Sequence, residues 1–126
     1  MAPAYTIDGK ISKKINRHIF HSKEEDYPWL EMTMPECYVR GVFIFSRYAY
    51  GARMKNIEVR AGKTSVPEGF RGRLTFNREV GFFTGPAEDA KAYRILFDIK
   101  VLAKYITLQK IGEVVTLEIN EVMIIV

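Results

Sequence analysis

The sequence has only one cysteine, Cys37, among 126 residues. A single thiol excludes an internal disulfide and a metal cage built from several cysteines. The chain also has no run of about 18 or more apolar residues, so we expect no transmembrane segment. The N-terminal residues lack a basic stretch followed by an apolar one. No signal peptide is therefore visible, and we expect either that a leader was removed or that the protein stays inside the cell.

The usual catalytic signatures are also missing. The sequence has no Gly-x-Ser-x-Gly motif, and no partner signature surrounds Cys37. Gly62-Lys63-Thr64 is similar to the end of a phosphate-binding loop, but Ile57 stands where that motif requires its first glycine. We therefore expect a protein that is not an enzyme.

The composition, 48% hydrophobic and 27% charged, is that of a folded globular protein, and the length favours one domain over residues 1–126. The net charge of +4 is spread over three stretches of the chain. Spread basic charge usually forms a solvated surface, although it also favours anionic glycans or lipid headgroups. Nucleic-acid binding is a weaker alternative, because no stacking motif accompanies the basic residues that would carry it: Arg60, Lys63, Arg71, Arg73 and Arg78.

Short stretches rich in β-branched and aromatic residues recur along the chain, separated by Gly and Pro turns. We predict a strand at residues 29–34 that Pro35 ends, a buried strand at 39–47, and an alternating strand at 55–62. Further strands are predicted at 93–99, 103–110 and 114–126, with a short one within 73–80 and mostly loop at 4–20. With almost no helical periodicity, this pattern indicates an all-β fold, an antiparallel sandwich or barrel.

Three polar residues are candidates for a ligand-binding rim. If the strands pair, His21, Arg47 and Arg53 return to the same neighbourhood. A guanidinium fork donates parallel hydrogen bonds to neighbouring sugar oxygens, and Tyr48 and Tyr50 would offer apolar faces to the sugar carbons. The alternative is that Arg47 ends its strand in solvent, that Arg53 pairs with Glu58 and that His21 only caps a loop.

Two carboxylates are candidates for a metal site. Asp8 lies in a polar Asp-Gly turn, and Glu121 interrupts an apolar run. A carboxylate in such a run needs a partner, because burying it alone is costly. The partner would be either a calcium ion shared with Asp8 or a nearby Lys or Arg, and the residues alone favour the salt bridge.

A colinear series of motifs resembles the F-type lectin (fucolectin) branch of the discoidin, or F5/8 type C, superfamily. The series runs through Ile7-Asp8-Gly9, Phe20-His21-Ser22, Pro28-Trp29-Leu30-Glu31, Val42-Phe43-Ile44-Phe45-Ser46-Arg47, residues 53–62 and Leu117-Glu118-Ile119-Asn120-Glu121-Val122. The resemblance implies a discoidin-like jelly-roll sandwich, similar to galactose-binding domains, that binds fucose or a galactose-like sugar without catalysis. It places the sugar-binding residues at His21, Arg47 and Arg53, and calcium ligands at Asp8 and Glu121.

The chain departs from that family in the segment between its two arginines. The lectins carry an Asp and two adjacent cysteines there, whereas this chain has Tyr48-Ala49-Tyr50-Gly51-Ala52. The family's first strand has no counterpart before the Asp-Gly turn, which would leave a sheet edge able to form a homo-oligomer. The resemblance implies a secreted protein, whereas the single cysteine fits a cytoplasmic one. An alternative function is a discoidin-type adhesion module whose apolar loop tips, such as Phe82-Phe83, bind protein or membrane.

Overall fold

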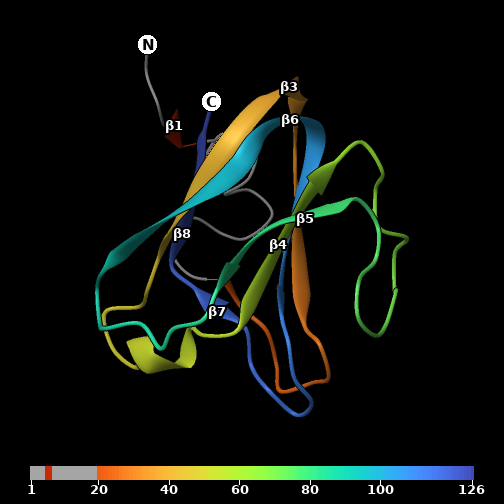
Figure 1. Cartoon of the computed structure of the whole chain (residues 1–126). Helices are drawn as coiled ribbons and strands as arrows, with labels where there is room; N and C mark the ends of the chain where they lie inside the picture. Colours follow the sequence, from red (N-terminus) through yellow and green to blue (C-terminus); the bar gives the residue numbers. More distant parts are fainter. Residues whose placement is uncertain (1–4, 7–19) are drawn as a thin grey trace.

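The computed structural model describes residues 5–6 and 20–126, and these residues form antiparallel strands and one short 3-10 helix (Figure 1). In this part of the chain no helix is long and apolar enough to cross a membrane. The elements are β1 (Tyr5–Thr6), β2 (Phe20–His21), β3 (Trp29–Phe45), η1 (Gly51–Arg53), β4 (Ile57–Gly62), β5 (Arg78–Phe83), β6 (Ala92–Lys110), β7 (Glu118–Ile119) and β8 (Glu121–Ile125).

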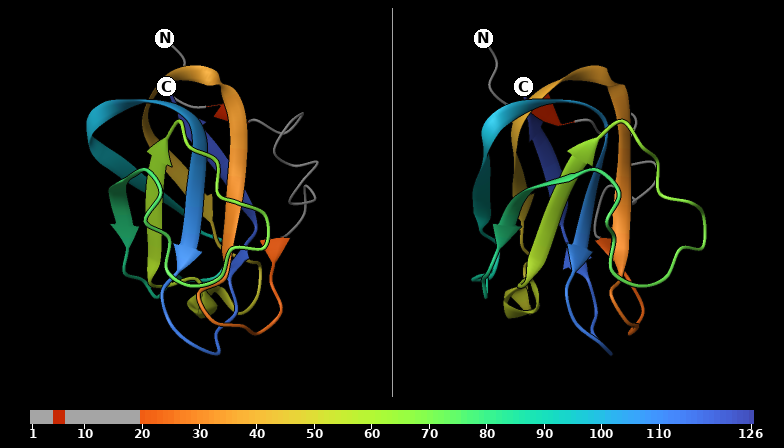
Figure 2. Two further views of the ribbon diagram at one scale, coloured as in Figure 1. Left: turned by 90° about the vertical axis from the view of Figure 1, so that its right-hand side faces the viewer. Right: turned by 45° about the vertical axis from the view of Figure 1, so that its right-hand side comes forward.

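Two long strands, β3 and β6, belong to both layers of a sandwich. The first half of β3 pairs with the second half of β6. The second half of β6 also pairs with β4, and β4 pairs with β5. The second half of β3 pairs with the first half of β6 and with β8. Figure 2 shows both strands arching over one end of the molecule from one layer to the other. The antiparallel β-sandwich expected from the sequence is confirmed.

The prediction that Pro35 ends a strand was wrong. The pairing with β6 is interrupted between Thr33 and Cys37, and β3 then continues to Phe45. Pro35 has no N–H to donate, and a bulge in a strand is one of the few places that tolerate it. A second irregularity precedes Gly41, where an added Cβ would collide with the carbonyl oxygen of Ile95. The strand therefore bends where its sequence cannot keep a regular ladder.

The other strand boundaries also differ from the predictions. The two strands expected at 93–99 and 103–110 form the single strand β6. The short strand expected within 73–80 is found at β5, and the long C-terminal strand is divided into β7 and β8 at Asn120. β1 pairs with β8, with Tyr5 opposite Ile124, so part of the edge expected to be open carries a strand.

The core lies between the layers and is almost entirely aliphatic. Alternate residues of β3, β4, β6 and β8 point into it, as the period of two predicts. Its fully buried large side chains include Met32, Ile44, Ile57, Ile106, Leu108 and Ile124. Leu117 and Ile119 join the same core from the segment around β7. This packing fixes the end of the sandwich where β3 ends and where β2 and β7 form a separate two-stranded sheet.

Candidate functional site

The turn that follows β3 is held by the segment 84–91. The Ser46 hydroxyl donates to the carbonyl of Glu88 over 2.5 Å and accepts from the Lys91 amide over 2.9 Å. The carboxylate of Asp89 accepts a hydrogen bond from the Gly51 amide over 2.6 Å. Gly51 has no room for a side chain, because an added Cβ would lie 2.5 Å from the carbonyl oxygen of Glu88. These contacts hold the backbone between the two arginines without a disulfide.

The two arginines that bound this turn meet at one carboxylate, that of Glu118. Nη1 of Arg47 donates to one oxygen of Glu118, and Nη1 of Arg53 lies 3.2 Å from the other. The Glu118 side chain is 1% exposed, whereas Arg47 and Arg53 are 25% and 50% exposed. A buried carboxylate therefore positions two guanidinium groups that still reach the surface.

Glu118 also connects this pair to His21. It lies in β7, and the register of the β2–β7 pair places His21 opposite Glu118. The structure thus brings the backbone of His21 beside the anchor of both arginines, and the side chain of His21 lies outside the described residues. The structure brings these three positions together, whereas their role in sugar binding stays a prediction.

The alternative partners expected for the arginines were wrong. Arg47 does not end its strand free in solvent, because it binds Glu118. Arg53 binds Glu118 rather than Glu58. Glu58 is itself buried and pairs with Arg60 at 2.9 Å and Arg73 at 2.7 Å.

Sequence reasoning missed Glu118 as a site residue. The signal was present, because Glu118 stands between Leu117 and Ile119, which are both buried in the core. A charged residue inside an apolar run needs a partner, and that argument was applied only to Glu121. Its two arginine partners are distant in the sequence, so only the folded chain identifies them.

One of the two predicted aromatic faces lies against the arginines. The guanidinium carbon of Arg53 is 4.5 Å from the centre of the Tyr50 ring, and that of Arg47 is 5.9 Å from it. Both distances fall within the range of cation–π attraction. Tyr50 remains 62% exposed and Tyr48 88% exposed. The site therefore combines charged donors with two accessible aromatic rings.

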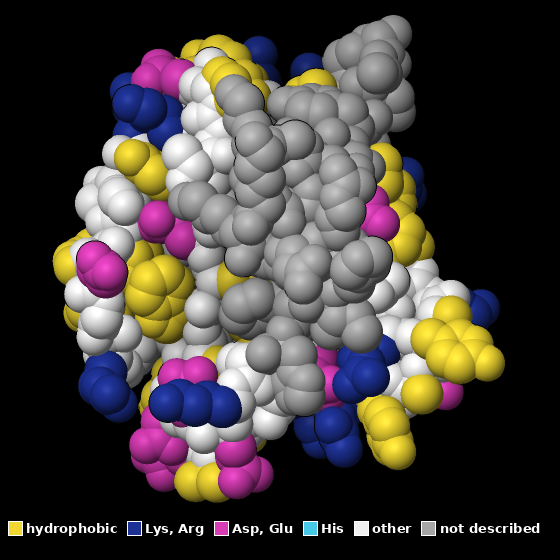
Figure 3. Space-filling model, turned by 180° about the vertical axis from the view of Figure 1, so that it is seen from behind, with side chains coloured by type: hydrophobic (Ala, Val, Ile, Leu, Met, Phe, Trp, Pro, Cys, Tyr) yellow, Lys and Arg dark blue, Asp and Glu magenta, His cyan; other side chains and the backbone are white. Residues whose placement is uncertain are grey.

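A further basic residue, Lys110, contacts the backbone of the site. The Lys110 ammonium, at the end of β6, donates to the carbonyl of Arg53 over 2.6 Å. Burial lowers the pKa of Lys110, and the neighbouring charges of Lys55 and Arg53 lower it further, against the opposing effect of Glu118. Seen from behind, Lys and Arg side chains gather beside acidic and hydrophobic ones toward the lower end of the molecule (Figure 3).

The predicted calcium ligands are only partly described. Asp8 lies outside the described residues. Glu121 begins β8, opposite Phe45 of β3. Within residues 5–6 and 20–126, no group of three or more His, Cys, Asp or Glu residues is placed to hold a metal ion.

Two of the five residues considered for nucleic-acid binding are held in a structural ion pair. Arg60 and Arg73 both bind the buried carboxylate of Glu58, and Arg60 also donates to the carbonyl of Asn77 over 2.9 Å. These contacts join the long segment after β4 to the outer face of that strand. Their geometry is explained without a phosphate ligand.

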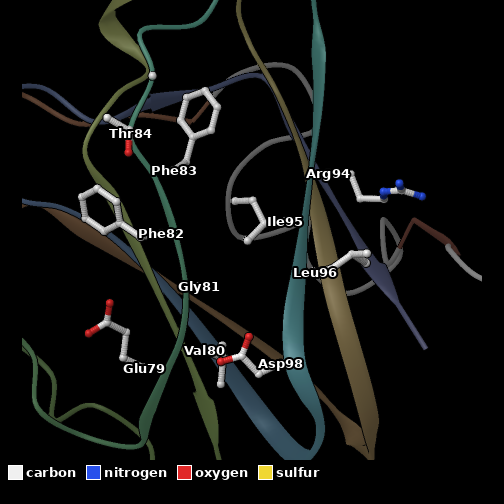
Figure 4. A pocket seen from close by; sticks show the side chains of 11 residues that line it. Glu79, Val80, Gly81, Phe82, Phe83, Thr84, Arg94, Ile95, Leu96 and Asp98 are labelled. Atoms are coloured by element: carbon white, nitrogen blue, oxygen red, sulfur yellow. The ribbon is translucent and has the colours of Figure 1, made fainter.

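A separate hollow lies between β5 and the first half of β6 (Figure 4). Its lining includes Phe82, Phe83 and Leu96, together with Glu79 and Asp98. The Phe83 ring packs on Tyr93 with ring centres 4.8 Å apart, whereas Phe82 is 43% exposed. The two phenylalanines expected at a loop tip therefore end a strand on the side of the sandwich.

No family model matches the sequence, and no curated protein matches it. Similar solved structures do exist. An F-lectin (fucolectin) from striped bass serum superposes with a TM-score of 0.73 at 23% identity, over 85% of this chain and 35% of that chain. The chain thus spans about a third of the length of that lectin.

Two carbohydrate-binding domains are similar over most of their length. The lectin domain of lectinolysin, solved with Lewis B antigen, has a TM-score of 0.65 at 19% identity, over 94% of this chain and 79% of that one. The family 32 module of NanJ from C. perfringens, solved with galactose, has a TM-score of 0.66 at 17% identity, over 96% and 89%. As the sequence resemblance implied, this chain has the discoidin-like β-sandwich fold that the F-type lectins share with family 32 carbohydrate-binding modules.

Proposed function

We propose that this domain is a non-enzymatic lectin-like module that binds fucose or a related sugar at the end of the sandwich. The observation that carries the proposal is the meeting of Arg47, Arg53 and Tyr50 around Glu118, with the backbone of His21 opposite that carboxylate. Similar domains were solved in complex with Lewis B antigen and with galactose, which supports the same class of partner. A secreted location would suit such glycans.

The geometry suits recognition of ring hydroxyls. A guanidinium has five N–H donors, and the contacts with Glu118 engage Nη1 of each arginine. The remaining donors of Arg47 and Arg53 can then bind vicinal sugar oxygens, with His21 as a further donor or acceptor. Tyr48 or Tyr50 would cover the apolar face of the sugar ring. Glu118 is too deeply buried to reach a ligand and acts as a positioning residue.

The test is a glycan array followed by calorimetry with the best ligand. Replacing Arg47 by Lys keeps one positive charge but removes the fork, and His21→Ala removes the third polar group. Each change should weaken binding about tenfold to a hundredfold, because one charge-assisted hydrogen bond contributes about 1.5–3 kcal/mol.

Arg78→Ala is the matched control, since Arg78 is an exposed arginine at the start of β5. It should bind sugar like the unaltered protein. An array without any hit, or Arg47→Lys and His21→Ala variants with unchanged affinity, would contradict the proposal. Circular dichroism of each variant checks that the fold is kept.

We further propose a structural calcium ion held by Asp8 and Glu121. Thr6, two residues before Asp8 in the sequence, lies opposite Met123, two residues after Glu121. Carboxylate and carbonyl oxygens are the ligands that Ca²⁺ prefers. Adding calcium should raise the melting temperature, and Glu121→Gln should remove that increase. Identical melting curves with calcium and with chelator would exclude this site.

A second candidate function is adhesion through the side of the sandwich. Phe82, Leu96 and Ile99 are 43%, 56% and 54% exposed, and the first two line the hollow in Figure 4. Exposed apolar side chains beside a hollow are a common feature of protein or membrane contacts. Liposome binding or partner capture that is lost in Phe82→Ser, with sugar binding unchanged, would favour this function. Unchanged capture by that variant would contradict it.

A further inference from the structure

The charges around the proposed sugar site do not balance. Arg47 and Arg53 share one carboxylate, that of Glu118. Lys110 adds a third cation through its contact with the carbonyl of Arg53, and Lys55 is close enough to lower the pKa of Lys110. The cluster formed by Arg47, Arg53, Lys55 and Lys110, which we call the basic cluster, therefore exceeds its buried counter-ion.

In the part of the chain that the structure describes, nearby carboxylates do not remove this excess. Asp89 lies against the turn, where one of its oxygens accepts from the Gly51 amide, so it neutralises at most one further charge. The five residues between the arginines, Tyr48-Ala49-Tyr50-Gly51-Ala52, contain no acidic side chain. Glu88 faces Lys91 at 3.9 Å. Among the residues that the structure describes, counting Glu118, Asp89 and also Glu121 against the four members still leaves the basic cluster with one positive charge.

The positive charge of Arg47 and Arg53 is also accessible to a ligand at the proposed sugar site. Arg53 is half-exposed and Arg47 a quarter exposed, whereas their carboxylate partner is buried. The guanidinium groups therefore present charge to the surface while the compensating charge lies behind them. Tyr50, between the two arginines and solvent-accessible, supplies an apolar surface beside that charge.

We propose that the preferred ligand of this site is an acidic saccharide, whose carboxylate or sulfate binds Arg53 and Arg47 while the sugar ring covers Tyr50 or Tyr48. This inference rests on the proposed sugar-binding function and adds the charge class of the ligand. A planar carboxylate or a sulfate accepts two parallel hydrogen bonds from a guanidinium fork, and a neutral hydroxyl cannot supply the same charge.

The experiment compares galacturonic acid with galactose, which differ at one position by a carboxylate, and includes fucose as a second neutral sugar. Calorimetry at low salt should show galacturonic acid binding about fivefold to tenfold more tightly than either neutral sugar, because the same guanidinium donors then bind a charged rather than a neutral acceptor. The ratio should fall toward one at about 1 M salt, where the screening length is only about 3 Å. Galactose 6-sulfate should share the advantage.

Two arginine variants distinguish an effect of charge at the site from an effect of the net charge of the protein. Arg53→Gln should lower the ratio of affinities for galacturonic acid and galactose to nearly one, whereas Arg78→Gln, which removes the same charge far from the site, should leave it unchanged. The salt titration of the unaltered protein gives the answer even if Arg53→Gln does not fold. Equal affinity for acidic and neutral sugars would overturn this inference alone. Binding of none of the sugars would overturn it together with the proposed function.

Discussion

Glu118 determines the geometry of the candidate site because it is the buried partner of both arginines. Its neighbours Leu117 and Ile119 are fixed in the core, so the carboxylate has little freedom to move. Truncating one member of a buried charge cluster leaves the other members without compensation. The position of the two guanidinium groups thus depends on a residue that no ligand would touch.

Replacement of Glu118 by Ala should lower the free energy of unfolding by about 2–4 kcal/mol, reduced from the fully buried case by the exposure of the arginines. Urea unfolding measures this change. Glu113→Ala is the control, because Glu113 is an exposed acidic residue in the loop before β7. Equal stability of the two variants would show that Glu118 is not an anchor.

Glu58 should make stability depend on pH in the acid range. Burial raises its pKa, but hydrogen bonds and charge from Arg73 and Arg60 outweigh burial and hold the pKa below its ordinary value of 4.5. Because the pKa of Glu58 is lower in the folded than in the unfolded state, its contribution is present above pH 4.5 and is lost as the pH falls through the folded value. Glu58→Gln should therefore be less stable than the parent at pH 7.

The same comparison at acid pH tests whether the stabilising contribution of Glu58 is lost as the pH falls. The difference in unfolding free energy between the parent and Glu58→Gln should shrink as the pH falls below 4.5 and through the lowered pKa of Glu58 in the folded parent, where that carboxylate becomes protonated. Glu68→Gln, at an exposed position in the loop after β4, serves as the control. A difference that grows on acidification would contradict the assignment.

At the scale of elements, one buried side chain of β6 holds two loops. The Gln109 amide nitrogen donates to the carbonyls of Tyr27 at 2.9 Å and Gly72 at 3.0 Å, and its oxygen accepts from the Leu74 amide at 2.9 Å. Gln109 is only 1% exposed, so water cannot easily replace these partners. The loops before β3 and after β4 are therefore joined through a strand.

Gln109→Leu should leave these backbone groups without their partner and cost about 2–4 kcal/mol of stability. It should also speed hydrogen exchange at the Leu74 amide much more than at amides of β3. Lys104→Leu, an exposed position of the same strand, is the control for the change of side chain. Unchanged protection of Leu74 would rule out the role of Gln109.

The positions of strands could largely be predicted, because buried and exposed residues alternate in them. The boundaries could not, because Pro35 would end an isolated strand but is tolerated in a bulge of β3. Alternation predicted the strand at 55–62, but it could not show that the loop 63–77 supplies Arg73 to Glu58 and the carbonyl of Asn77 to Arg60. Such contacts depend on how distant segments fold together.

The candidate site could also be predicted only in part. The meeting of His21, Arg47 and Arg53 could be predicted from strand pairing and from the resemblance. The anchor at Glu118 and the support from Asp89 and Lys110 could not, because each residue reaches the site from a different element. Pairing of charges across such distances is set by the packed core rather than by local sequence.

For the whole molecule, a ligand that binds only the folded state should raise stability by mass action. At a sugar concentration of 100 times Kd the gain is about 2.7 kcal/mol, and for a chain of this size that corresponds to a rise in melting temperature of roughly 8–14 °C. Differential scanning fluorimetry with the best array ligand measures the shift. A tight ligand that leaves the melting curve unchanged would show that the sugar is not bound by the native fold.

The arched pair of β3 and β6 has a consequence for how the chain reaches its fold. Trp29 lies opposite Gln109 and Phe45 opposite Ala92, so each layer depends on partners that are far apart in the sequence. Closing such long loops before any contact forms is slow, and proteins dominated by distant pairings fold in about milliseconds to seconds. During synthesis, neither layer can be completed until β6 has left the ribosome. Until then β3 has no partner strand, and an unpaired strand with apolar residues makes an incomplete chain prone to aggregation.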